Sequence, residues 1–111
     1  MRVSLTALVL FGFAISASAA ETDADVWVAK ARSIIISHHL LSQRVMRCTA
    51  LIYGQESTTS MAGIDAVEKH GGRCKGNPMT MPRMFSMQID KATGQAKWDR
   101  DTGDLTMKPV P

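Results

Sequence analysis

The sequence predicts an α+β fold, in which a long N-terminal helix and a short second helix pack on a C-terminal three-stranded antiparallel meander, with one disulfide. Apolar residues recur at helical spacing in the first half of the chain. In the last third, apolar and polar residues alternate between turn signals, as in strands with one buried face. The chain also contains 2 cysteines, the number needed for a single bridge.

Residues 1–20 have the features of a cleaved signal peptide. Arg2 precedes an apolar run over residues 5–15, and small residues fill positions 16–20. The run is too short to span a bilayer, and small residues are typical of a cleavage site. We therefore expect the mature chain to be a single small α+β domain over residues 21–111, periplasmic or secreted. A retained signal anchor is the alternative.

The charge balance gives no sign of a polyanionic partner. The chain has 13 Lys and Arg and 10 Asp and Glu residues. Loss of Arg2 with the signal peptide leaves 12 basic against 10 acidic residues, a net charge of +2. Nucleic-acid-binding domains carry a larger positive charge clustered on one face. We therefore expect no nucleic acid, and no stable membrane insertion after cleavage.

Residues 23–53 are predicted to form the long N-terminal helix. The segment contains neither Pro nor Gly, and its apolar positions recur at steps of three and four. Thr22 and Asp25 resemble a capping box, and Gly54 supplies a stop. A break near residues 37–39 and a dimer seam along the apolar stripe are the alternatives. The stripe consists of Trp27, Ala31, Ile34, His38, Leu41, Val45, Cys48 and Ile52.

A polar loop over residues 55–60 is expected to lead into the short second helix, residues 61–69. Gly71 and its neighbour end that helix. Residues 73–83 contain two prolines and a glycine, so they are expected to cross the domain as an irregular segment. The apolar side of the second helix consists of Met61, Ile64 and Val67.

Cys48 and Cys74 are predicted to form the disulfide, because an even cysteine count in an exported chain favours pairing in an oxidising compartment. Such a bridge contributes on the order of 3 kcal/mol to the stability of a small domain. Intermolecular pairing and a redox or metal role are the alternatives. The Cys-x-x-Cys spacing of redox sites is absent from the sequence.

The last third of the chain predicts three strands, residues 85–89, 95–99 and 104–108. The turns between them, residues 90–94 and 100–103, both end in Gly, as tight turns that need positive φ do. The apolar face of this meander needs a cover, which the long helix supplies. That face is predicted to consist of Phe85, Met87, Ile89, Ala96, Trp98, Leu105 and Met107.

The methionine run is the sharpest chemical signal in the sequence. Met79, Met81 and Met84 are candidate copper ligands, because thioethers select Cu(I) where thiols are oxidised. Met87 belongs to the alternating apolar face of the first strand, where methionine fills space in a core. We favour core filling for these sulfurs. A copper site would be completed by one of His38, His39 and His70.

Other patterns favour structural roles. Residues 101–103 match the aspartic-protease tripeptide, but an exposed hairpin turn would not hold two carboxylates together. The acidic residues around Gly103 resemble part of a calcium loop without its final Glu. His38 is expected to be a hydrogen-bonded core residue and His39 to face solvent. Basic residues near the second cysteine are expected to be solvated: Lys69, His70, Arg73, Lys75 and Arg83.

These observations favour a small exported, non-enzymatic binding or interaction protein of the bacterial cell envelope, with a protein partner. A three-stranded meander has two open edges, where a partner strand adds at low cost. Pro109 and Pro111 blunt the last strand, so the open edge is expected at residues 84–89 or on the middle strand. A copper-binding protein is the alternative function. A homodimer through the helix stripe is also compatible with the sequence.

Overall fold

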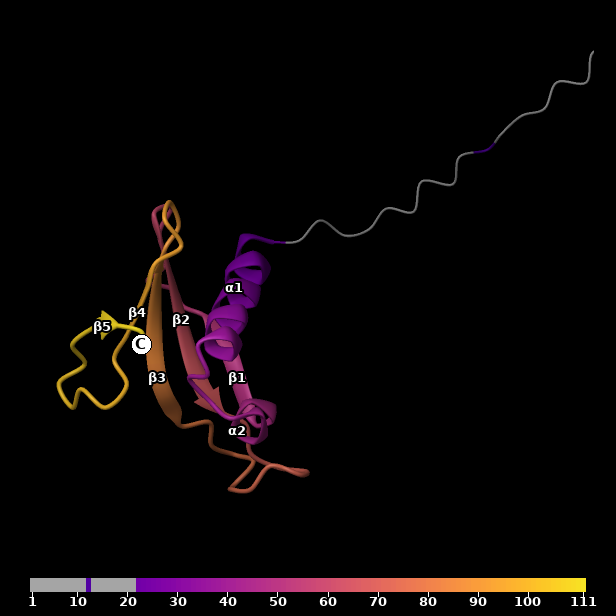
Figure 1. Cartoon of the computed structure of the whole chain (residues 1–111). Coiled ribbons are helices and arrows are strands. Elements are labelled where there is room, and N and C mark those ends of the chain that lie inside the picture. Colours follow the sequence, from indigo (N-terminus) through magenta and orange to yellow (C-terminus); the bar gives the residue numbers. More distant parts are fainter. Residues whose placement is uncertain (1–11, 13–21) are drawn as a thin grey trace, which may run out of the picture.

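The computed structural model describes residue 12 and residues 22–111, so the predicted signal peptide, apart from Gly12, lies outside the described residues. The described chain is an α+β domain with two helices on an antiparallel sheet (Figure 1). The helices are α1 (Asp23–Ser37) and α2 (Gln43–Arg47). The strands are β1 (Thr49–Tyr53), β2 (Met61–Glu68), β3 (Arg83–Asp90), β4 (Ala96–Trp98) and β5 (Lys108–Pro109).

Helix α1 begins as predicted and ends earlier than predicted. The Thr22 hydroxyl accepts from the Asp25 N–H and the Asp25 carboxylate accepts from the Thr22 N–H, which confirms the capping box. At the other end His39 adopts a left-handed φ of 52°, which ends the helix. The Ser42 side chain then caps α2 by accepting from the Val45 N–H. The single helix over residues 23–53 is therefore wrong, and the alternative of a break near residues 37–39 is confirmed.

Residues predicted as helical form the first two strands instead. In β1, Leu51 and Tyr53 pack against the core, while Ile52 on the opposite face is exposed. In β2, Ala62 and Ile64 are buried under α1. The predicted second helix over residues 61–69 is therefore wrong. Both strands carry apolar residues on both faces, which hides the period of two that marks a half-buried strand.

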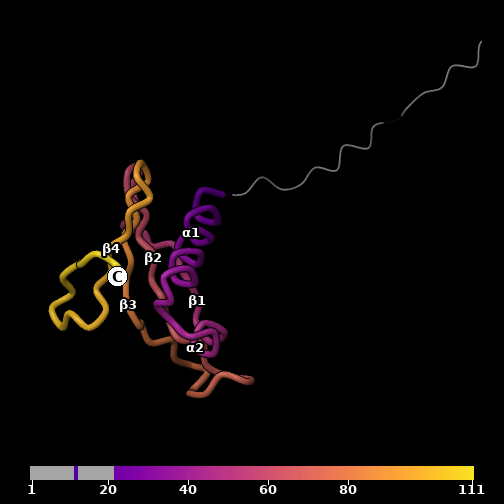
Figure 2. The backbone as a smooth tube through the Cα atoms, viewed as in Figure 1, coloured from indigo at the N-terminus to yellow at the C-terminus, as the bar shows by residue number. Residues whose placement is uncertain are grey.

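The sheet is a simple meander in the order β1-β2-β3-β4-β5, with every neighbouring pair antiparallel. The backbone tube in Figure 2 passes from each strand to the next, and the segment between β2 and β3 extends below the sheet. The prediction of three strands is corrected to five. Strand β3 pairs with β2 and β4, and β4 pairs with β3 and β5. The prediction of an open edge at residues 84–89 or on the middle predicted strand is therefore wrong. The open edges belong to β1 and β5.

The core lies between α1 and one face of the sheet. Phe85 and Met87 from β3 are each 1 % exposed, which confirms that Met87 fills the core. The Phe85 and Trp98 rings meet edge to face with centroids 5.2 Å apart. Leu105 is 63 % exposed, so its predicted place on the apolar face is wrong. The third predicted strand shrinks to Lys108–Pro109, because Leu105 takes a left-handed φ of 64°.

Polar contacts hold both ends of α1 against the sheet. At the start, Lys91 Nζ donates to Asp23 Oδ2 at 2.8 Å and to Tyr53 Oη at 2.9 Å. The hydrogen bond from Lys91 lowers the pKa of Asp23, and the same contact raises the pKa of Lys91. At the end, His38 Nδ1 lies 2.8 Å from the backbone oxygen of Pro111. His38 is exposed, which corrects its predicted place in the core.

The predicted disulfide is present between Cys48 and Cys74, which lie 26 residues apart in the sequence. It joins the residue before β1 to the segment that connects β2 and β3. Residues 69–82 of that segment contain no helix or strand, so the bridge cross-links an irregular loop to the start of β1.

Replacement of both cysteines, Cys48→Ala with Cys74→Ala, is expected to lower the free energy of unfolding by on the order of 3 kcal/mol, because the unfolded chain regains conformational entropy. For a domain of this size the melting temperature should fall by more than about 10 °C. Circular dichroism during heating measures the change, with Met79→Leu as a control in the same loop. An unchanged midpoint would contradict a stabilising bridge.

Candidate functional site

The disulfide gathers basic residues at the end of the domain that carries α2. Arg47 immediately precedes Cys48, and Arg73 and Lys75 flank Cys74, so the bridge brings these three charged residues into one neighbourhood. The Lys69 N–H donates to the Cys48 carbonyl at 2.8 Å, which adds a further basic residue. Arg44 belongs to α2, and Arg32 lines a groove with Arg47. We call this set the cationic pole: Arg32, Arg44, Arg47, Lys69, Arg73 and Lys75.

The side chains of the cationic pole are exposed and make no ion pair with any described carboxylate. Two other basic residues that sequence analysis grouped with them are paired instead. Arg83 donates to the buried carboxylate of Asp99 at 2.8 Å, and His70 contacts Glu68. The sequence prediction of a solvated cluster therefore applies to Lys69, Arg73 and Lys75 alone. The pole retains charge that is free to meet an external anion.

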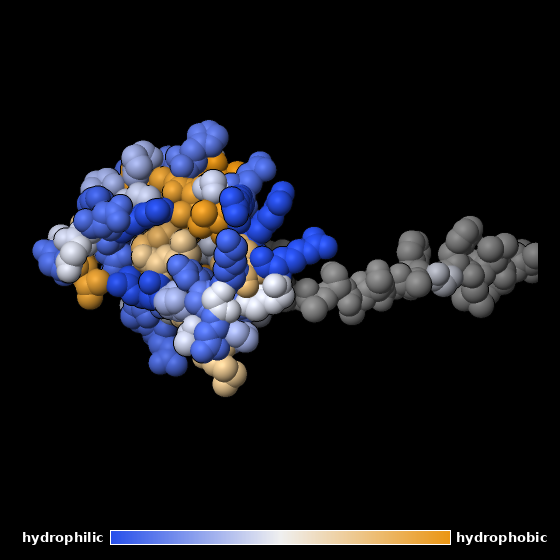
Figure 3. Space-filling view, turned by 90° about the horizontal axis from the view of Figure 1, so that it is seen from below, coloured by the Kyte–Doolittle hydropathy of each residue, from blue (hydrophilic) through white to orange (hydrophobic). Residues whose placement is uncertain are grey.

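An apolar groove opens beside the cationic pole, where the chain turns from α1 into α2. Its volume is about 650 Å³. Ile36, Leu41 and Met46 supply its apolar lining, and Ile36 is 57 % exposed. Figure 3 views the molecule from the end that carries α2 and shows hydrophobic side chains gathered among hydrophilic ones. The rim of the groove is basic or polar: Arg32, His39, Ser42, Gln43 and Arg47.

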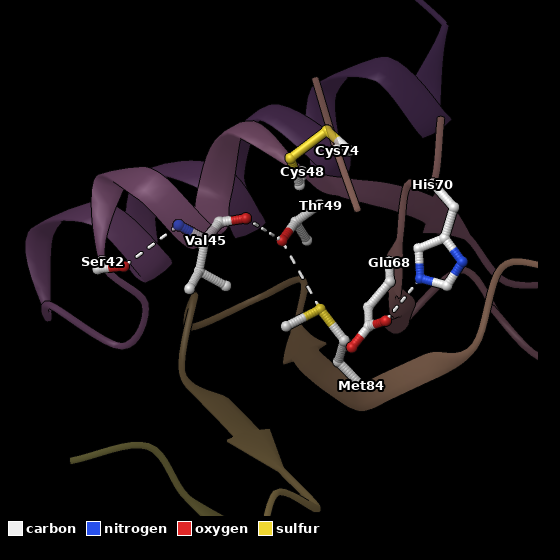
Figure 4. The surroundings of a disulfide bond; sticks show 8 residues. All are labelled: Ser42, Val45, Cys48, Thr49, Glu68, His70, Cys74 and Met84. Carbon is white, nitrogen blue, oxygen red and sulfur yellow. Dashed lines mark hydrogen bonds and ion pairs between the residues drawn. A yellow bond between two sulfur atoms is a disulfide. The ribbon is translucent and has the colours of Figure 1, made fainter. Parts of the chain in front are cut away.

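His70 organises the loop that carries the rest of the pole. Its Nε2 lies 2.8 Å from Glu68 Oε2, as Figure 4 shows. Its Nδ1 lies 3.0 Å from both the Asn77 carbonyl and the Thr80 hydroxyl. The hydrogen bond to Glu68 and the contact with the Asn77 backbone raise the pKa of His70, because both favour the charged ring. The ring and the disulfide together fix residues 69–80.

Gly76 lets the loop close over this ring. It has a φ of +110°, and a Cβ atom there would lie 2.6 Å from the His70 ring. Any other residue at this position would displace the imidazole.

The four methionines of the run do not share one environment. Met79 is 87 % exposed and Met81 is 54 % exposed, both on the loop. The Met84 sulfur turns inward and accepts from the Thr49 hydroxyl at 3.6 Å, as drawn in Figure 4. Met87 is buried in the core. The prediction that these sulfurs fill the core is therefore wrong for Met79 and Met81, and two of the three candidate copper ligands are open to solvent.

The acidic residues near the last turn serve the sheet. Asp99 Oδ1 accepts from the Ser86 N–H at 2.7 Å, and its other oxygen accepts from Arg83. Asp101 is exposed with a left-handed φ of 60°. Across residue 12 and residues 22–111, no group of three His, Cys, Asp or Glu side chains is placed to hold a metal ion.

A second groove, of about 630 Å³, lies between α1 and the strands β4 and β5. Asp90 and Lys97, which have opposite charges, both line it. The mixed charge selects no class of ligand, so the groove beside the cationic pole is the stronger candidate site.

The sequence does not predict this groove, because the spacing of its apolar residues predicts a continuous helix through residues 38–48. A signal was present in the charge pattern, since no acidic residue stands between Asp25 and Glu56 while four basic residues do. Those residues are Lys30, Arg32, Arg44 and Arg47.

Comparisons with known proteins identify no relative: no family model, no curated protein and no solved structure matches this chain. Within the described ranges, each helix is too short or too polar to cross a bilayer.

Substitution His70→Gln is expected to remove a stabilisation that depends on pH. The raised pKa means that the folded state binds the proton more tightly than the unfolded chain, whose value is about 6.5. The contribution is therefore complete below about pH 6.5 and disappears as the pH rises through the folded-state value. Urea unfolding at pH 6 and pH 8.5 should show a larger wild-type advantage at the lower value.

The matched control is His39→Asn, which removes an exposed ring that bonds to no described residue and keeps a side chain tolerant of left-handed φ. An equal loss at both pH values for His70→Gln would refute the contribution of the charged ring.

Proposed function

We propose that this chain is a small exported, non-enzymatic binding protein that recognises an acidic protein partner through the groove beside the cationic pole. The observation that carries the proposal is the coincidence of unpaired basic residues with an exposed apolar groove. Both cysteines are joined in a disulfide, which removes the thiols as nucleophiles and is typical of an oxidising compartment.

Charge complementarity argues for an acidic partner. Arg32 and Arg47 stand on the groove rim, and neither pairs with a carboxylate among the described residues. A guanidinium presents paired donors that match a carboxylate, so Asp or Glu side chains are the groups it binds best. An anionic partner would also be attracted over a distance by the whole pole.

The groove lining argues for a partner that is amphipathic as well as acidic. Ile36 and Met46 present an apolar surface that a charged peptide alone would leave exposed. An amphipathic helix with apolar residues on one side and Asp or Glu beside them would contact both the apolar lining and the basic rim of the groove. Methionine adapts its shape to such a partner.

Charge reversal on the rim tests the proposal. The mature chain as bait should retain acidic proteins from the native exported fraction, and Arg32→Glu with Arg47→Glu should lose them. A synthetic helical peptide with Leu and Glu on adjoining faces should bind the wild type, at least about tenfold more tightly than the variant. Fluorescence anisotropy measures that affinity.

Lys97→Glu with Lys108→Glu is the matched control, because it changes net charge equally at exposed positions on β4 and β5. Equal peptide binding by all three proteins would overturn the proposal, as would binding to phosphatidylglycerol vesicles in place of the peptide.

Copper binding is a second candidate function, favoured by the exposure of Met79 and Met81 on a loop that the disulfide fixes. Both flank Thr80, whose hydroxyl contacts His70. The imidazole nitrogens already contact Glu68, Asn77 and Thr80, so an ion between the two sulfurs would compete for this ring.

Titration of the oxidised protein with Cu(I) against a competing chelator tests this candidate. Binding tighter than about micromolar is expected if it holds, with a loss of at least about tenfold in Met79→Leu with Met81→Leu. Met61→Leu, which replaces an exposed thioether on β2, should leave the affinity unchanged. Absence of submicromolar binding by the wild type would remove the copper candidate.

A further inference from the structure

Strand β1 is an edge of the sheet, and two hydrogen bonds show which of its backbone groups face β2. The Lys69 N–H donates to the Cys48 carbonyl, and the Gly54 N–H donates to the Gly63 carbonyl, both at 2.8 Å. Cys48 and Gly54, the two residues that flank β1, therefore direct these backbone groups toward β2. Since that direction alternates along an antiparallel strand, Leu51 and Tyr53 direct theirs away from the sheet.

The outward backbone groups of Leu51 and Tyr53 are unpaired within the described chain. Strand β1 pairs with β2 alone, and no turn, loop or helix cap among the described residues bonds to either residue. Thr49 is different, because it is 2 % exposed and its hydroxyl donates to the Val45 carbonyl of α2. The open part of the edge is therefore centred on Ile52.

This edge lacks the devices that normally prevent strand addition. β1 has the sequence TALIY, with neither charge nor proline. The other edge of the sheet, β5, consists of Lys108 and Pro109, both of which discourage pairing. Ile52 is 45 % exposed and lies between the two unpaired residues. An apolar side chain and unpaired backbone groups thus coincide on one short segment.

We propose that β1 pairs antiparallel with β1 of a second copy of this chain, with Ile52 on the two-fold axis. In this register Leu51 of one copy faces Tyr53 of the other, so all the unpaired groups of both residues are satisfied by roughly four hydrogen bonds. The two Ile52 side chains meet across the axis at the closer type of antiparallel pair.

The charges that flank β1 favour the antiparallel direction and a second copy. Arg47 precedes the strand and Glu56 follows it, and neither makes an ion pair with a described residue. Antiparallel pairing sets the basic end of one strand beside the acidic end of the other. Parallel pairing would set Arg47 beside Arg47. The apolar strand and the charged residues on either side of it are therefore both complementary to a second copy.

Sedimentation equilibrium of the oxidised mature chain tests the proposal. The wild type is expected to dimerise at concentrations on the order of 100 µM or below, and Ile52→Lys to weaken dimerisation at least about tenfold, because two charges would meet on the axis. Val26→Lys, the same kind of change at an exposed position on α1 outside the groove, should leave it unchanged. A monomeric wild type, or a dimer indifferent to Ile52→Lys, overturns the proposal.

A second variant keeps the test independent of any folding defect in Ile52→Lys. Ile52→Cys is expected to form a disulfide between copies, because Cα atoms of such a pair lie about 4.5 Å apart. Val45→Cys, also at an exposed position, should not cross-link. Peptide mapping identifies the bridge, and its absence overturns the register. Ile52 does not line the groove, so failure here leaves the proposed acidic partner unaffected.

Discussion

The disulfide between Cys48 and Cys74 is the constraint on which the candidate binding end depends. It fastens an irregular loop to the start of β1, and this brings basic residues from distant parts of the sequence together. Like charges repel, so loop and helix would separate their basic residues if the chain were free to do so. A covalent bond imposes the arrangement, and His70 supports it by engaging residues on both arms of the same loop.

The sequence predicts correctly those features whose signals lie in a few neighbouring or paired residues. The capping box, the disulfide and the alternation around Phe85 and Met87 each act over a few positions, and each prediction is confirmed. Strand β2 was misread because Ala62, Gly63 and Ile64 are consecutive buried residues. A strand that is covered on both sides has no alternation, and residues 61–69 satisfied helical spacing by coincidence.

The groove could not be predicted by the same reasoning. Its lining comes from the end of α1, the turn that follows and α2, so it exists only because the chain breaks at His39 and is recapped at Ser42. The sequence allows a break near residues 37–39 only as an alternative, because neither Pro nor Gly stands there to require it. That Arg32 and Arg47 pair with no carboxylate in the described part of the chain is likewise a tertiary property, because it depends on where each of those carboxylates lies.

The attachment of α1 at both ends has a consequence for recognition. Lys91 holds Asp23 near its start, and Arg100 donates to the Leu40 carbonyl just beyond its end. Between these two contacts Ala31 and Ile35 are buried in the core, so the wall that α1 lends to the groove is already in place before a partner binds. Rigidity of this kind reduces the conformational entropy that the groove loses on association, so most of that loss falls on the bound partner.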